Sequence, residues 1–117
     1  MQSKNFEFLR PTWQELANLG GFAEVYLHTD PSGSLVKLRI FGENVVKNVY
    51  SELNLPKTYQ NSFLDLLSNG AFKTAVPQVI SDKLNALRIH GNKAAHGDKI
   101  SSQTASWLLK EAFDVAR

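Results

Sequence analysis

The chain has 117 residues, of which 43% are hydrophobic and 21% charged, as in a single soluble globular domain. The absence of cysteine excludes a disulfide framework, a thiol nucleophile and a cysteine zinc site. No apolar run approaches the ~18–20 residues that span a bilayer, and the N-terminus lacks a signal-peptide pattern, so we expect a cytoplasmic protein. The net charge of +2 is spread along the chain, which does not indicate a dedicated nucleic-acid-binding face.

Apolar residues recur with a helical period and never alternate as in a strand, which predicts an all-α chain of about five helices. The first helix is expected over about 12–29. Thr12 and Glu15 match a capping box at its start. The adjacent Gly20 and Gly21 weaken this helix and favour a bend or a break within it.

The second helix is expected to begin at Asp30 and Pro31, a good N-cap followed by a good first-turn residue. It runs to about 54 and is closed by Pro56. One face of this helix carries the predicted core residues Leu35, Leu38, Gly42, Val45, Val46, Val49 and Leu53.

Residues 55–61 read as a loop. A short third helix over 63–68 follows, with Ser62 and Asp65 at its start and a stop at Asn69 and Gly70.

A fourth helix is expected from about Pro77, with Gly97 as the residue just beyond its end. Ser101 or Ser102 caps a fifth helix, whose apolar period continues to the last residue. This indicates that the chain is one domain, 1–117, cut from a longer protein. The short connections favour antiparallel packing into a bundle.

Two polar sets flank the apolar stripes of the second and fourth helices. Their members lie four residues apart, so each set follows one side of its helix. They are Arg39 and Glu43 on the second helix, and Arg88, Asn92 and His96 on the fourth.

Each of these helices also has a glycine in mid-stripe, Gly42 and Gly91, which costs about 1 kcal/mol relative to alanine. Close helix approach would compensate, so we predict that the two helices cross near these glycines. The polar residues then meet along a seam, where Glu43 pairs with an arginine and Asn92 bonds across the crossing.

The polar residues have structural interpretations as well as functional ones. A partly buried Arg–Glu pair often only fixes the register of two helices. His96 in the last helical turn suits the helix dipole. His90 and His96 are out of register for shared ligation, so no metal site is expected. Trp107 lies partly off the core face of its helix and is a candidate interface residue.

The chain resembles a known helical domain in several segments. Residues 35–43 follow the pattern L-x-K-x-R-x-F-G-E and residues 87–96 the pattern L-R-x-x-G-N-x-A-x-H; residues 5–9 and the Asp30, Pro31 pair also match. Together they resemble the N-terminal helical domain, of unknown function, of type I restriction enzyme R subunits and related DEAD/DEAH-type helicases. The resemblance implies a parent protein with an ATP-driven motor and, in restriction enzymes, a nuclease.

This chain has none of the corresponding motifs: no G-x-x-x-x-G-K-[ST] loop, no G-x-S-x-G and no H-E-x-x-H. ATP and Mg²⁺ are therefore expected only in the parent. We predict a non-catalytic accessory domain whose partners are the rest of the parent chain and other restriction-complex subunits, with contact to DNA through the parent.

The domain is also similar to the HEPN group of helical bundles, some of which are metal-independent ribonucleases with an Arg-x(4–6)-His motif. His96 would be the histidine. The matching upstream positions are Ile89, His90 and Gly91, and Arg88 is separated from His96 by seven residues. This departure argues against ribonuclease activity through His96, which stays the alternative interpretation.

Overall fold

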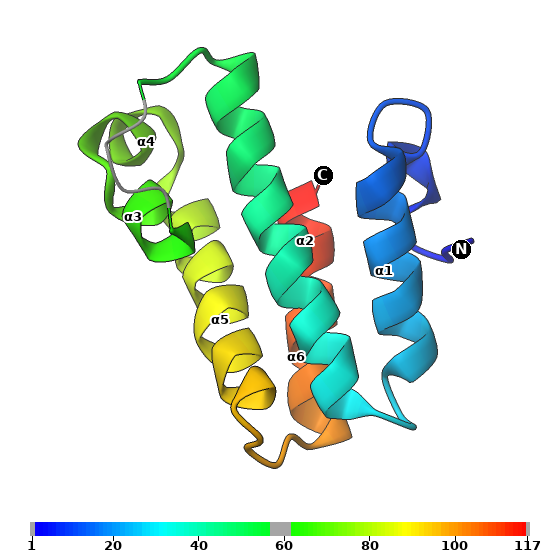
Figure 1. The fold of residues 1–117 in the computed structure, drawn as a ribbon. Coiled ribbons are helices and arrows are strands. Elements are labelled where there is room, and N and C mark those ends of the chain that lie inside the picture. Colours follow the sequence, from blue (N-terminus) through cyan, green and yellow to red (C-terminus); the bar gives the residue numbers. More distant parts are fainter. Residues whose placement is uncertain (1, 57–61, 117) are drawn as a thin grey trace.

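The computed structural model describes residues 2–56 and 62–116. In these ranges the chain forms a 3-10 helix, six α-helices and no strand. The elements are η1 (Glu7–Leu9), α1 (Gln14–Tyr26), α2 (Pro31–Glu52), α3 (Phe63–Ser68), α4 (Gly70–Ala75), α5 (Gln78–Ala95) and α6 (Ser102–Ala116). The long helices α1, α2, α5 and α6 alternate in direction (Figure 1), which confirms the predicted antiparallel bundle. Among the described helices none is long and apolar enough to cross a membrane.

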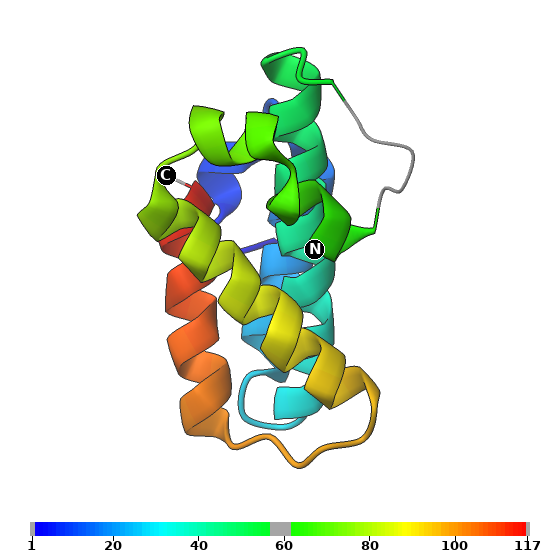
Figure 2. The same cartoon turned by 90° about the vertical axis from the view of Figure 1, so that its left-hand side faces the viewer.

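Helix α2 occupies the centre of the bundle and packs against α1, α5 and α6. Figure 2 shows α5 running obliquely across this core, with α3 and α4 covering the end where α5 begins. Because α2 has neighbours on several sides, its buried residues exceed the single predicted stripe. Phe41 and Tyr50 are fully buried, whereas the predicted core residue Leu53 is 54% exposed.

Several helix ends follow the predicted local signals. Asp30 accepts a hydrogen bond from the Gly33 amide at 3.0 Å and caps α2. Ser62 and Asp65 form a reciprocal capping box at α3, and Gly97 has a φ of +91° just beyond α5. Helix α2, which is expected to run to about 54, ends two residues earlier at Glu52, before a left-handed Asn54.

The capping box predicted for Thr12 and Glu15 at the start of the first helix is wrong. Helix α1 begins at Gln14, and its N-cap, Trp13, makes no side-chain capping bond. The reason is that η1 precedes it: the backbone amide of Thr12 donates to the Leu9 carbonyl, so this residue belongs to the preceding turn.

The paired glycines do not break α1, which continues through both of them. Gly20 instead makes room for the buried Phe6, since a Cβ at Gly20 would lie 2.4 Å from Phe6 Cδ2. Phe6 packs edge-on against Phe41 and Phe113. The glycine is thus explained by packing between the N-terminal segment and α1.

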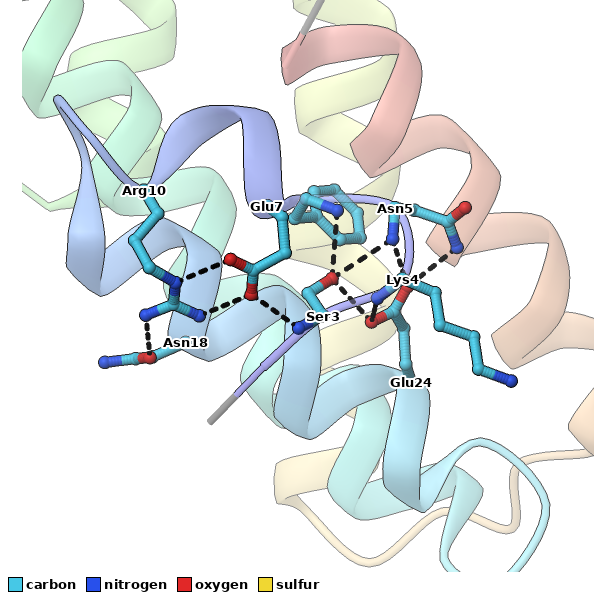
Figure 3. Close-up of polar contacts among 8 residues, drawn as sticks. Ser3, Lys4, Asn5, Glu7, Arg10, Asn18 and Glu24 are labelled. Carbon is cyan, nitrogen blue, oxygen red and sulfur yellow. Dashed lines mark hydrogen bonds and ion pairs between the residues drawn. The ribbon is translucent and has the colours of Figure 1, made fainter.

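A polar cluster ties this N-terminal segment to α1 (Figure 3). The Glu24 carboxylate accepts hydrogen bonds from Ser3 Oγ at 2.6 Å and from the backbone and side chain of Asn5 at 3.0 and 2.7 Å. Nearby, Arg10 donates to Glu7, and the Ser3 amide does the same; together they lower the pKa of Glu7 to about 2. These contacts hold Phe6 in the core.

Helix α4 is an element that the sequence does not predict. Asn69 and Gly70 are typical of a helix end followed by a loop. Asn69 does end α3, but its side chain also accepts a hydrogen bond from the Ala71 amide at 2.9 Å and caps α4. Of the predicted loop at 55–61, residues 57–61 lie outside the described residues.

Candidate binding site at the crossing of α2 and α5

Helices α2 and α5 approach each other closely at Gly91. A Cβ added there would lie 2.4 Å from Arg39 Cβ and 3.1 Å from the backbone oxygen of Leu35. At Gly42, by contrast, a Cβ would meet side-chain ends, Leu87 Cδ1 and a Phe63 ring carbon, each at 3.2 Å. Both glycines therefore lie in the α2–α5 interface, but the Cβ atom that Gly42 faces, Leu87 Cβ, would be at 3.6 Å, and only Gly91 also faces a backbone atom.

A pocket of about 380 Å³ opens beside this crossing. It is lined by Arg39, Glu43, Ser62, Phe63, Leu64, Arg88 and Asn92. Four of the five seam residues predicted from the sequence thus share one pocket, and His96 does not line it. The start of α3 supplies the remaining wall, which the helical spacing of α2 and α5 alone does not indicate.

The acidic member of the pocket interacts within its own helix. Glu43 lies 3.9 Å from Arg39 Nη1 and 3.9 Å from Lys47 Nζ, both on α2. The arginine that Glu43 pairs with is therefore Arg39, and no described ion pair joins it to Arg88. Partly exposed pairs at such distances contribute little to stability.

The nitrogen donors of the pocket are incompletely used. Arg88 Nε donates to Asn85 Oδ1 of the same helix at 3.1 Å. Arg39 Nε is buried and has no hydrogen-bond partner among the described residues. The predicted hydrogen bond of Asn92 across the crossing is not formed within the described part of the chain. The two guanidinium groups and the amide of the pocket therefore keep N–H donors for which no described residue is an acceptor.

His96 lies away from this pocket, at the end of α5. It is exposed and forms the C-cap, where its backbone amide donates to the Asn92 carbonyl at 3.0 Å. Residues 62–116 and 2–56 contain no group of three or more His, Cys, Asp or Glu side chains placed to hold a metal ion. The pocket and the histidine are thus separate features.

The other histidine of α5 packs against α6. His90 meets the ring of Trp107 edge-on, with 5.4 Å between centroids, and burial together with the nearby Lys93 lowers the pKa of His90. Trp107 is 46% exposed and donates from Nε1 to Glu111 at 3.0 Å. The tryptophan is therefore an accessible aromatic group, as expected from its place on the helix, but it lies in a different interface from the pocket.

A second hollow, of about 300 Å³, lies between η1, α1, α2 and the end of α6. Most of its walls are apolar, with contributions from Trp13, Leu16, Val49 and Val115. None of its described lining residues is cationic. The pocket at the α2–α5 crossing is therefore the better candidate for recognition of a charged ligand.

Comparison with known proteins reveals one informative relationship. The chain is 32% identical over 117 residues to the type I restriction enzyme EcoKI endonuclease subunit of Escherichia coli strain K12. The alignment covers 99% of the chain but 10% of that subunit, so the chain spans about a tenth of the relative's length. No family model and no solved structure matches the chain. The chain is thus related, along nearly its whole length, to part of a restriction enzyme subunit.

Proposed function

We propose that this chain is a non-catalytic accessory domain of a larger type I restriction enzyme R subunit or related ATP-dependent DNA helicase. The observation that carries the proposal is the end-to-end similarity to the EcoKI endonuclease subunit, of which the chain matches only a tenth. Such a domain would dock on the rest of its parent chain or on other subunits of the complex. ATP and Mg²⁺ would be bound by the parent, in which DNA is restricted or translocated.

The charge distribution favours protein docking over direct DNA docking. Thirteen Lys and Arg residues are balanced by eleven Asp and Glu residues, and several of these pair with each other, as Lys83 does with Glu111 and Asp114. DNA binding depends on several phosphate contacts and weakens steeply with salt. We therefore expect no saturable binding of a fluorescent DNA duplex in anisotropy titrations at physiological salt. Tight binding that disappears as salt rises would instead identify a DNA-docking domain.

The accessory role itself is tested by a segment exchange. In the EcoKI endonuclease subunit, the segment that matches this chain is either deleted or replaced by the whole 117-residue chain. The proposal expects the exchange to recover assembly and DNA restriction that the deletion loses. Equal loss in both variants would contradict it.

The alternative is a HEPN-type ribonuclease that acts through His96. The separation of Arg88, which lines the pocket, from His96, which does not, supports the non-catalytic interpretation. Incubation of the purified chain with RNA tests this directly. Cleavage that is abolished by His96→Ala, and not by His90→Ala, would replace the proposal with the enzymatic one.

A further inference from the structure

The position of Arg39 between two helices is costly in two ways. Its side chain is only 28% exposed, and its Nε is buried without an acceptor among the described residues. The root of this side chain is also accommodated only because residue 91 is glycine, which is unfavourable within a helix. A hydrophobic side chain at position 39 would avoid the unpaired donor, so packing alone does not explain an arginine.

The second guanidinium makes the pocket cationic. Arg88 lines it, and only its Nε has an acceptor in the described part of the chain, so its two Nη groups retain their donors. Against these two positive charges stands one carboxylate, Glu43, which is shared with Lys47 outside the pocket. The Asn92 amide adds neutral hydrogen-bonding capacity. The pocket therefore has an excess of positive charge and enough space to bind one monoanionic group.

We propose that the pocket formed by Arg39, Arg88 and Asn92 binds a carboxylate carried by an acidic side chain of a partner protein. This inference rests on the proposed role as an interaction domain, for which it names the chemistry of the contact. Guanidinium groups present planar forks of N–H donors that match the two oxygens of a carboxylate. The amide of Asn92 would donate a further hydrogen bond to the same group.

The surroundings favour a protein partner over a nucleic acid. Glu43 inside the pocket offsets one of its two arginine charges, so the positive charge that remains matches one carboxylate and not the successive phosphates of a polyanion. Apolar groups stand beside the charges, because Phe63 forms part of the wall and Leu64 is 49% exposed. A peptide with an acidic side chain next to an aliphatic one could satisfy both features at once.

Titration of the 117-residue chain with two tripeptides tests the inference. Acetyl-Leu-Glu-Leu-amide carries the carboxylate, and acetyl-Leu-Gln-Leu-amide is the matched neutral control. Two-dimensional ¹⁵N NMR follows the Nε–H signals of Arg39 and Arg88 and the side-chain amide of Asn92. We expect the Glu peptide to shift these signals with a dissociation constant on the order of millimolar, and the Gln peptide to leave them unchanged.

Variants assign the binding to the pocket. Arg88→Gln should weaken binding about tenfold or more, because it removes a charge-assisted fork. Lys93→Gln removes the same charge from an exposed position of the same helix and should have little effect. Asn92→Asp places a competing carboxylate in the pocket and should abolish binding, with the NMR spectrum showing that each variant is folded.

Three results would overturn the inference. The first is an absence of shifts with the Glu peptide, and the second is equal weakening by Arg88→Gln and Lys93→Gln. The third is tighter binding of a short DNA duplex at the same signals, which would reassign the pocket to phosphate. Failure of the peptide titration alongside a successful segment exchange would reject this site and retain the accessory role. A failed exchange with intact peptide binding would retain this site and reject the accessory role.

Discussion

Gly91→Ala adds a single carbon where α2 and α5 are in close contact. The new Cβ would lie 2.4 Å from Arg39 Cβ, 3.0 Å from Arg39 Cγ and 3.1 Å from the Leu35 carbonyl oxygen. Arg39 Cβ is attached directly to the backbone and cannot rotate away, so the two helices must separate. Overpacking of this kind costs about 1–3 kcal/mol, whereas replacement of a mid-helix glycine by alanine gains about 1 kcal/mol. With a contact this short we expect the upper part of the overpacking range, and a net loss of about 1–2 kcal/mol.

Two other glycines provide matched controls. At Gly42 the added carbon would meet the movable ends of Leu87 and Phe63 at 3.2 Å, so gain and cost should nearly cancel. At Gly70, the first residue of α4, a Cβ would meet nothing within 4 Å, and Gly70→Ala should be neutral or slightly stabilising. Urea unfolding followed by circular dichroism should place the Gly91→Ala midpoint about 1 M below that of the unsubstituted 117-residue chain, for an m value of about 1–2 kcal/mol/M.

The order of stability among the three variants is the decisive result. If Gly91→Ala is as stable as Gly42→Ala, or more stable than the unsubstituted chain, then α2 and α5 are not in close contact at residue 91. That result would also remove the close approach that accounts for the placement of Arg39, and with it one support for the charged pocket.

Three further predictions concern polar contacts. Hydrogen bonds from Arg10 and the Ser3 amide lower the pKa of Glu7 from its usual 4.5 to about 2, so the carboxylate stabilises the fold at neutral pH and this contribution is lost between about pH 5 and 2. Glu7→Gln should flatten the pH dependence of unfolding in that window, and an unchanged curve would contradict the pKa shift. Tyr50→Phe leaves the Leu66 carbonyl without its 2.6 Å buried hydrogen bond and should cost about 1–3 kcal/mol in urea unfolding; a neutral effect would show that this bond is replaceable. A double-mutant cycle between Glu43 and Arg88 should give a coupling energy near zero, because Glu43 pairs with Arg39 and Lys47 instead; coupling above about 1 kcal/mol would show a cross-helix pair.

Elements that depend on local signals can be predicted from the sequence. Asp30 and Pro31 start α2, Ser62 and Asp65 start α3, and Gly97 follows α5, because each signal acts through backbone groups within a few residues. The same signals fail where one residue can serve two elements. Asn69 ends one helix and caps the next, and its sequence neighbours do not distinguish a stop from a restart.

The N-terminal segment shows how tertiary contacts override local preference. Thr12 and Glu15 have the spacing of a capping box, but η1 packs against α1 and draws Thr12 into its own turn. Gly20 resembles a weak point of the helix because the sequence does not reveal that Phe6 lies across it. Both errors arise from the contact of a segment with a helix that follows it in the chain.

The pocket is predictable in part for a geometric reason. Residues four apart share a helix side, so Arg39 with Glu43, and Arg88 with Asn92, can be placed on the flanks of their helices. The wall supplied by Phe63 and Leu64 cannot, because it depends on how the chain returns from α2 to α3. The hydrogen bond from Arg88 to Asn85 is also absent from the prediction, although its i,i−3 spacing is a signal that the sequence does contain.

The distribution of polar contacts separates a structural seam from a binding site. A pair that fixes the register of two helices must join them, as Lys83 of α5 does when it contacts Glu111 and Asp114 of α6. Between α2 and α5 no described polar side-chain contact crosses the interface: Glu43 and Arg39 pair within α2, and Arg88 and Asn85 within α5.

At the crossing of α2 and α5, Gly91 instead packs against Cβ and Cγ of Arg39, and Gly42 packs against Leu87. The charged ends of Arg39 and Arg88 are therefore not needed to align these helices. Their shared pocket, in which the Nη groups of Arg88 have no acceptor among the described residues, is better explained by a group that arrives from outside the domain.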